Sequence, residues 1–207
     1  KLTKLVDAQG ASAAEALESL VSGDFEFDVT DDEPAAANDA TDIASDVEDA
    51  PVVRFLQKML VDAINMRRRQ RVIDLAREEL GSLIGRNITV LGASFKPNSD
   101  DVRDSPALAV AGALSLAGAQ VSVYDPQAMT NASKVFPTLM YADTVWDALH
   151  NADVVVVATE WTEFKQLDPS EARACVASPT IIDGRNCLDV DAWMQAGWSV
   201  RALGRSL

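Results

Sequence analysis

Three cationic side chains stand in loops of this 207-residue chain where they could bind an anion. Lys96 and Arg103 belong to the polar stretch Ala93–Ser105, and Arg185 follows the apolar stretch Thr180–Asp183. The first loop ends in a serine followed by a proline, which is typical of a helix start with free amide donors. Arginine adds bidentate hydrogen bonds that suit phosphate. These residues predict a site for an anionic ligand, in particular a phosphorylated one.

A purely structural role for the same residues stays open. Acidic neighbours in the first loop could pair with Lys96 and Arg103 and make it a salt-bridged loop; these are Asp100, Asp101 and Asp104. Arg185 could equally be an ordinary surface arginine.

Four further side chains have chemistry of their own. Trp161 could cover a planar or sugar ring, or it could pack against a helix start. His150 is expected to be solvated at a helix end, and Cys175 and Cys187 to be inert thiols. The sequence therefore predicts no catalytic residue and no metal ligand.

Two nucleotide-binding motifs are missing from the chain. Gly92 is followed by Ala93, Ser94 and Phe95, so the first loop does not have the G-x-G-x-x-G dinucleotide fingerprint. No G-x-x-x-x-G-K-[ST] occurs either, and ATP hydrolysis is not supported.

Short apolar segments alternate with helical ones after residue 85. The expected strands are Ile88–Gly92, Val121–Tyr124, Leu139–Tyr141, Val154–Ala158, Thr180–Asp183 and Ser199–Leu203. The expected helices between them are Pro106–Ala117, Asn131–Val135, Thr144–His150, Pro169–Val176 and Asp189–Ala196. The alternation predicts an α/β fold, a Rossmann-like doubly wound parallel sheet of order 3-2-1-4-5-6. Ligands of such sheets bind past the carboxyl ends of the strands, which selects the loops above.

A long helix is expected before this domain. Apolar residues recur three and four apart from Val52 to about Leu83. Asp49 or Pro51 marks the start, and Gly81 and Gly85 are candidate stop signals. We interpret the basic run Arg67-Arg68-Arg69-Gln70-Arg71 as a solvated or salt-bridged face, and leave a ligand-facing role open. The apolar stripe is longer than one small domain needs, which favours self-association.

The charge of the chain is concentrated at its start. Lys and Arg number 18 against 32 Asp and Glu, a net charge of −14, and residues 1–50 hold −12 of it. A nucleic-acid partner is not expected of so acidic a chain. The stretch Asp24–Ala50 has few large apolar residues, so we expect a largely disordered acidic arm. The expected division is an arm over 1–50, a linking helix over 51–84 and a domain over 85–207.

A cytoplasmic location is expected from the same composition. No apolar run approaches the ~20 residues that cross a bilayer, and the first ten residues have no apolar signal-peptide core. Two cysteines make no disulfide framework.

Four motifs carry a resemblance to a known family. They are GASFKPNSDDVRDSPAL at Gly92–Leu108, VYDPQA at Val123–Ala128, ADVVVVATEWTEFK at Ala152–Lys165 and IIDGRNCLD at Ile181–Asp189. In this order they resemble the C-terminal domain of UDP-glucose 6-dehydrogenase, over about residues 65–205. The segment Ile64–Leu80 resembles the end of the central dimerisation helix of that family.

The resemblance implies roles for individual residues. Phe95 and Lys96 resemble substrate contacts, and Arg185 resembles the arginine that binds the UDP part of the substrate. Arg103 resembles the arginine that reaches across to NAD, and Trp161 joins the expected substrate-binding set. The complete enzyme would oxidise UDP-glucose to UDP-glucuronate with NAD, as a homodimer formed through the long helix.

Other parts of the family pattern are missing from these 207 residues. The NAD domain with its glycine fingerprint and the motif of the catalytic cysteine do not occur, and neither Cys175 nor Cys187 has that context. We therefore expect a UDP-sugar-binding domain without dehydrogenase turnover of its own.

The first 64 residues are expected not to resemble that enzyme. The segment Asp49–Ile64 resembles the N-terminal region of type IV pilus or type II secretion assembly ATPases, which suggests a chimera. The alternative function is a non-catalytic interaction or scaffold module that uses the acidic arm and the long helix.

Overall fold

A computed structural model describes residues 51–204 of the chain. Ile64 and the described residues after it form one compact unit. The predicted acidic arm over residues 1–50 lies outside the described residues. No helix within residues 51–204 is both long enough and apolar enough to cross a membrane.

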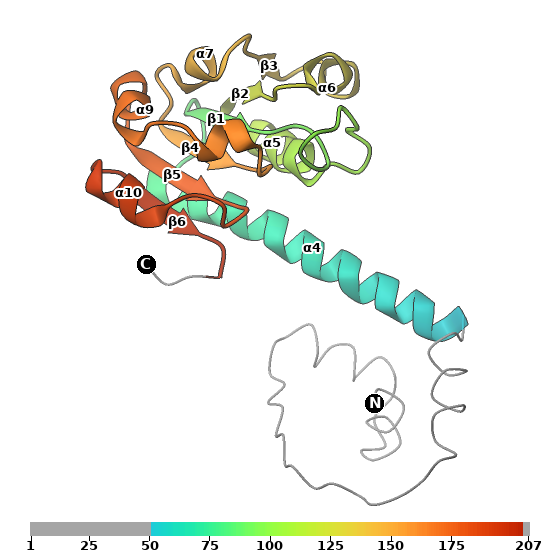
Figure 1. Cartoon of the computed structure of the whole chain (residues 1–207). Coiled ribbons are helices and arrows are strands. Elements are labelled where there is room, and N and C mark those ends of the chain that lie inside the picture. Colours follow the sequence, from blue (N-terminus) through green and yellow to red (C-terminus); the bar gives the residue numbers. More distant parts are fainter. Residues whose placement is uncertain (1–50, 205–207) are drawn as a thin grey trace, which may run out of the picture. The chain divides into compact units, whose positions relative to one another are not determined.

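Six parallel strands form one sheet in the order β3-β2-β1-β4-β5-β6 (Figure 1). The strands are β1 Asn87–Leu91, β2 Gln120–Tyr124, β3 Met140–Tyr141, β4 Val154–Val157, β5 Thr180–Asp183 and β6 Ser199–Ala202. The predicted α/β fold and strand order are confirmed. Because all strands run in one direction, their carboxyl ends meet at one edge, and Leu91 lies beside Tyr124 and Val157 there.

Helices cover both faces of this sheet. They are α4 Pro51–Leu80, α5 Pro106–Leu116, α6 Met129–Val135, α7 Val145–Leu149, α8 Thr162–Lys165, α9 Pro169–Cys175 and α10 Val190–Gln195. One core cluster joins α4, α5 and α6 to the sheet, and a second joins α7 to α10 to its other face. The helix α8 is missing from the sequence prediction, because four residues carry no periodic pattern.

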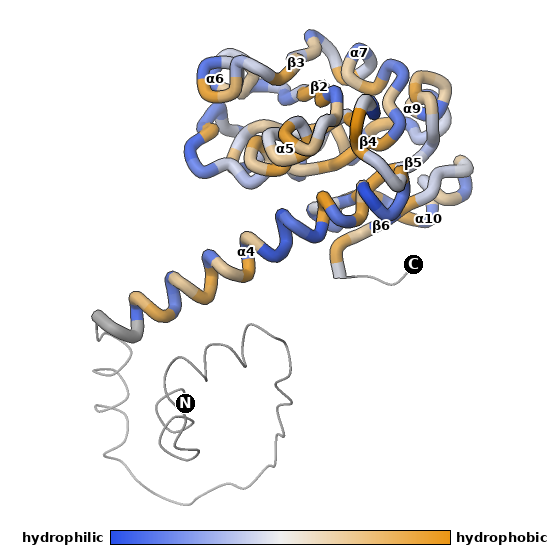
Figure 2. Tube along the Cα trace, turned by 180° about the vertical axis from the view of Figure 1, so that it is seen from behind, coloured by the Kyte–Doolittle hydropathy of each residue, from blue (hydrophilic) through white to orange (hydrophobic). Residues whose placement is uncertain are grey.

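The strand β4 explains why both faces must be covered. Its four valines are at most 1% exposed, with Val154 and Val156 in one cluster and Val155 and Val157 in the other. Such a strand is apolar on both faces and belongs in the middle of a parallel sheet. Figure 2 shows the hydrophobic character of β4 and α5.

The second half of α4 belongs to the same unit as the sheet. Val72, Ile73, Leu75 and Ala76 are buried in the cluster with α5, at the three- and four-residue spacing of a helix face. The helix ends where Gly81 takes a positive φ of 70° and donates its N–H to a carbonyl of the last turn.

Gly92 brings two loops together at the carboxyl edge. Its φ is +113°, and a Cβ there would lie 2.6 Å from the Cβ of Thr159, which follows β4. Only glycine permits both this backbone and this approach. The loops after β1 and β4 are therefore in direct contact.

Candidate ligand-binding site

A buried aspartate shapes the loop that carries Arg185. Asp183 ends β5, is fully buried, and accepts the backbone N–H of Arg185 at 3.0 Å through one carboxylate oxygen. Its other oxygen accepts the N–H groups of Cys187 at 2.8 Å and Leu188 at 2.9 Å. These bonds fold the residues after β5 into a tight turn, which fixes the backbone position of Arg185.

The guanidinium of Arg185 is bonded to Glu160 in the loop after β4. Hydrogen bonding to Arg185 lowers the pKa of Glu160, and the same bond raises the pKa of Arg185. The arginine side chain stays 38% exposed and keeps donors free for a ligand.

A cleft of about 620 Å³ lies on the α4 and α5 side of the carboxyl edge. We name it the arginine cleft. Its lining residues are Asn65, Arg67, Arg68, Arg69, Arg71, Val72, Pro106, Ala107, Val110, Val156, Val157, Ala158, Gly184, Arg185, Asn186, Leu203 and Gly204. Within the described part of the chain, this lining contains five arginines and no carboxylate. The volume lies in the range of small-molecule sites.

The basic run of α4 forms one wall of this cleft. The sequence favours a solvated or salt-bridged face for it, and Arg71 does pair with Glu78 at 2.5 Å. Arg67, Arg68 and Arg69 nevertheless line the arginine cleft. The signal for this is present in the sequence, since Arg68 and Arg69 precede the core residue Val72 by four and three positions and share its helix face.

A second buried aspartate, Asp125, joins three loops at the other half of the edge. One oxygen accepts the N–H groups of Ala93 at 2.8 Å and Ser94 at 3.0 Å, the Ser94 hydroxyl at 2.9 Å and the Trp161 indole at 3.0 Å. The other accepts the N–H groups of Gln127 and Ala128. Burial raises the pKa of Asp125, but the backbone hydrogen bonds outweigh it and the pKa lies below its ordinary value.

Asp125 also decides whether the first loop suits NAD. In a dinucleotide-binding fold, the N–H groups after the first strand face the pyrophosphate. Here those of Ala93 and Ser94 are donated to a carboxylate of the protein itself. Among the residues that the structure describes, this turn therefore does not fit the pyrophosphate of NAD.

The remaining predicted residues of the first loop do not line the arginine cleft. Phe95 is 52% exposed, and Lys96 is exposed as well. Arg103 donates to Asp101 at 2.9 and 2.7 Å, and this pairing lowers the pKa of Asp101 to about 2. This ion pair is the one expected if the first loop is salt-bridged and Arg103 has a structural role.

The predicted residue Trp161 is buried, at 5% exposure, with its indole N–H bonded to Ser94 and Asp125. Cys187 lies in the turn after β5, where burial, with a further contribution from Asp183, raises the pKa of its thiol to about 11. His150 is exposed at the end of α7, as expected. Of the five predicted site residues, only Arg185 lines the arginine cleft.

Comparisons with known proteins identify the domain around these loops. Residues 89–190 match the UDP binding domain of the UDP-glucose/GDP-mannose dehydrogenase family. The chain is 33% identical over 174 residues to UDP-glucose 6-dehydrogenase YwqF of Bacillus subtilis, covering 83% of this chain and 38% of that protein. It is 42% identical over 125 residues to UDP-glucose 6-dehydrogenase of Rhizobium meliloti, covering 60% of this chain and 29% of that protein.

A solved structure agrees with these similarities. The UDP-glucose dehydrogenase of Pyrobaculum islandicum matches with a TM-score of 0.58 and 29% identity, over 72% of this chain and 35% of that one. The chain thus spans between 29% and 38% of the lengths of these three relatives.

The comparisons correct one expectation about the first 64 residues. Residues 65–207 make up about 69% of the chain, so an alignment over 83% of it also includes residues before Asn65. The expectation that residues 1–64 do not resemble UDP-glucose 6-dehydrogenase is therefore wrong for part of that segment. The expectation is based on recognisable motifs, and these all lie at or after Gly92, so a similarity without motifs before that point cannot be seen. These three relatives give no support to a secretion-ATPase segment or a chimera.

Proposed function

We propose, for a chain that carries the C-terminal UDP-binding domain of the UDP-glucose/GDP-mannose dehydrogenase family, that its arginine cleft binds the UDP part of a UDP-sugar. One observation carries the proposal. In a chain with a net charge of −14, the cleft gathers five arginines and, among the described residues, no carboxylate.

The chemistry of the cleft supports this ligand. Arg185 presents donors that suit a phosphate, and Asn186 beside it adds a side-chain amide. Val110, Val156 and Leu203 supply an apolar lining against which a flat base could pack.

Thermal unfolding of the whole chain with UDP tests the proposal. At about 100 times its Kd, UDP should raise Tm by about 5–10 °C through linkage. Arg185→Ala should remove the shift. Arg86→Ala is the matched control, because Arg86 pairs with Asp153 next to the amino end of β1 and does not line the cleft. An unchanged Tm at millimolar UDP would contradict the proposal.

The finer roles expected from the resemblance belong to the same proposal. Phe95 and Lys96 would contact the substrate, and Arg103 would reach the NAD of the complete enzyme, which oxidises UDP-glucose. For Trp161 the proposal is indirect, because its buried indole holds the loops through Ser94. Lys96→Ala should raise the Kd of UDP-glucose and leave the Tm of the ligand-free chain nearly unchanged, because Lys96 is exposed. An unchanged Kd would show that Lys96 does not contact the substrate.

We also propose that two copies associate through α4. Five large apolar side chains along it are exposed, namely Phe55, Met59, Val61, Ile64 and Met66. Burying them between two copies would remove apolar surface from water. Light scattering should give a dimer for the whole chain and a monomer for Phe55→Ser/Met59→Ser. A monomer of the unaltered chain at high concentration would contradict this.

A further inference from the structure

The basic run of α4 faces the arginine cleft with its charge largely free. Arg68, Arg69 and Val72 share one helix face, and all three line the cleft. Val72 is buried in the core, so it fixes the orientation of this face toward the sheet. The burial of Val72, one helical turn after Arg68 and Arg69, therefore holds these two arginines at the cleft.

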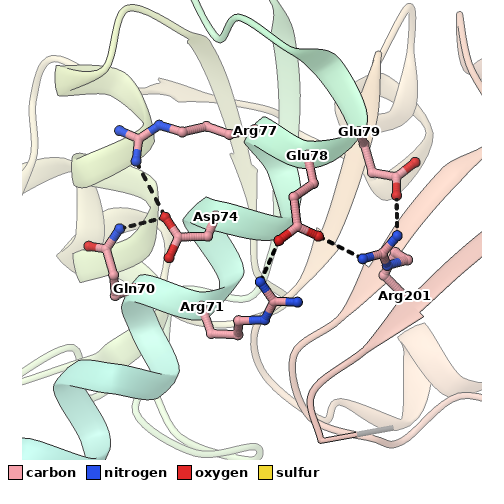
Figure 3. Close-up of polar contacts among 7 residues, drawn as sticks. All are labelled: Gln70, Arg71, Asp74, Arg77, Glu78, Glu79 and Arg201. Carbon is pink, nitrogen blue, oxygen red and sulfur yellow. Dashed lines mark hydrogen bonds and ion pairs between the residues drawn. The ribbon is translucent and has the colours of Figure 1, made fainter. Parts of the chain in front are cut away.

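The acids that could neutralise this face are occupied elsewhere, as Figure 3 shows. The bonds run from Gln70 and Arg77 to Asp74, from Arg71 and Arg201 to Glu78, and from Arg201 to Glu79. Arg201 comes from β6 and so ties the last turns of α4 to the sheet. Among the described residues, Arg67, Arg68 and Arg69 have no ion pair.

Arg69 adds an independent observation. Its Nε is buried and has no hydrogen-bond partner among the described residues. A buried N–H without an acceptor is rare in folded proteins, and arginine cannot give up its charge instead. An oxygen atom of a ligand in the cleft would satisfy it.

Other segments that line the cleft are also suited to anions. Arg185 follows the end of β5, and the start of α5 contributes Pro106 and Ala107. This helix has eleven residues, and its positive dipole end favours negative charge. Arginines from two segments, α4 and the turn after β5, thus line one cleft, which suits a ligand with two linked phosphates better than one with a single charge.

We propose that Arg68 and Arg69 bind the diphosphate of the ligand together with Arg185, and that the cleft selects nucleoside diphosphates over nucleosides. The identity of the nucleoside rests on the proposed function, but the binding of a diphosphate by α4 does not. The site therefore extends to the long helix, beyond the loops of the sheet.

Calorimetric titration of the whole chain with UDP, inorganic pyrophosphate and uridine tests this. In Arg68→Gln/Arg69→Gln, the Kd of UDP should rise about 10–100-fold, and pyrophosphate binding should be lost. The control Arg77→Gln/Arg86→Gln removes the same charge outside the cleft and should change the Kd less than about twofold. Should the double variant unfold, Arg68→Gln alone gives the same comparison with an exposed residue.

The outcomes separate this inference from the proposed function. Equal UDP affinity in Arg68→Gln/Arg69→Gln and the unaltered chain, with binding lost in Arg185→Ala, would overturn the inference and keep the proposed function. Pyrophosphate binding that depends on Arg68 and Arg69, without UDP binding, would keep the inference and overturn the proposed function. Binding of neither ligand would overturn both.

Discussion

Two buried aspartates stand at the carboxyl edge of the sheet, and their effects are opposite. Asp125 after β2 accepts N–H groups from the turn after β1, so that turn is closed by the protein's own carboxylate. Asp183 at the end of β5 accepts from its own loop and holds the backbone of Arg185, which lines the arginine cleft. The same residue type thus closes the turn at one half of the edge and fixes a cleft-lining arginine at the other.

The hollows beside the two aspartates differ in the same way. A hollow of about 380 Å³ beside Asp125 is also lined by Asp143, and no Lys or Arg lines it in the described part of the chain. We name it the aspartate hollow. The arginine cleft has the reverse composition. Position along a parallel edge therefore does not by itself make a phosphate site; free donors are needed as well.

The largest effect on stability is expected for Asp125→Asn, which tests whether this carboxylate holds the loops together. The amide oxygen can still accept from Ala93, Ser94 and Trp161. The amide NH2 would then face the N–H groups of Gln127 and Ala128, which now bond the other carboxylate oxygen. The free energy of unfolding should fall by about 3 kcal/mol, because buried donors lose their acceptor. Urea unfolding measures it, and a loss below about 0.5 kcal/mol would show that Asp125 does not hold these loops.

Asp183→Asn should have a smaller effect on stability and a clear effect on binding. The amide oxygen can still accept the N–H groups of Cys187 and Leu188, but the amide NH2 cannot accept the N–H of Arg185. The loss of this one hydrogen bond should lower the free energy of unfolding by about 1–2 kcal/mol. UDP should bind more weakly, since the turn that presents Arg185 loosens. If stability falls while the Kd of UDP stays the same, Asp183 does not prepare the site.

The pH dependence of unfolding gives a separate test of the Asp125 carboxylate. The pKa of Asp125 lies below its ordinary value of about 3.9, so the carboxylate stabilises the fold above that pH. This stability should be lost as the pH falls through the folded-state pKa. The unfolding free energy of the unaltered chain should therefore fall more steeply below pH ~4 than that of Asp125→Asn. Parallel curves would contradict the assignment.

The smallest expected effect concerns the thiol beside Arg185. Burial raises the pKa of Cys187 to about 11 from an ordinary value of 9.0, so its thiolate should be about 100-fold scarcer near pH 8. In Cys175→Ser, alkylation of Cys187 by iodoacetamide should be slower by that factor than in the unfolded chain. Equal rates would mean that the cation beside it outweighs its burial.

The fold was predictable because its signals are local. The β-branched run Val154–Val157 is typical of a strand covered on both faces, and the serine and proline at the start of α5 mark a helix start. Ser105 caps α5 as expected and also donates its hydroxyl to the carbonyl of Ala93.

The site was predictable only in part, because it depends on contacts between distant segments. Arg185 could be selected from its place after a strand. The direction of Arg68 and Arg69 depends on how α4 packs, which periodicity alone does not give. The role of Asp125 depends on Ala93 and Trp161, which are far from it in the sequence.

A crystal structure of the whole chain with UDP tests the central claim most directly. We expect the diphosphate in the arginine cleft, within hydrogen-bonding distance of Arg185 and of Arg68 or Arg69. Density for UDP in the aspartate hollow, or against Phe95 and Lys96 with the arginine cleft free of ligand, would contradict it.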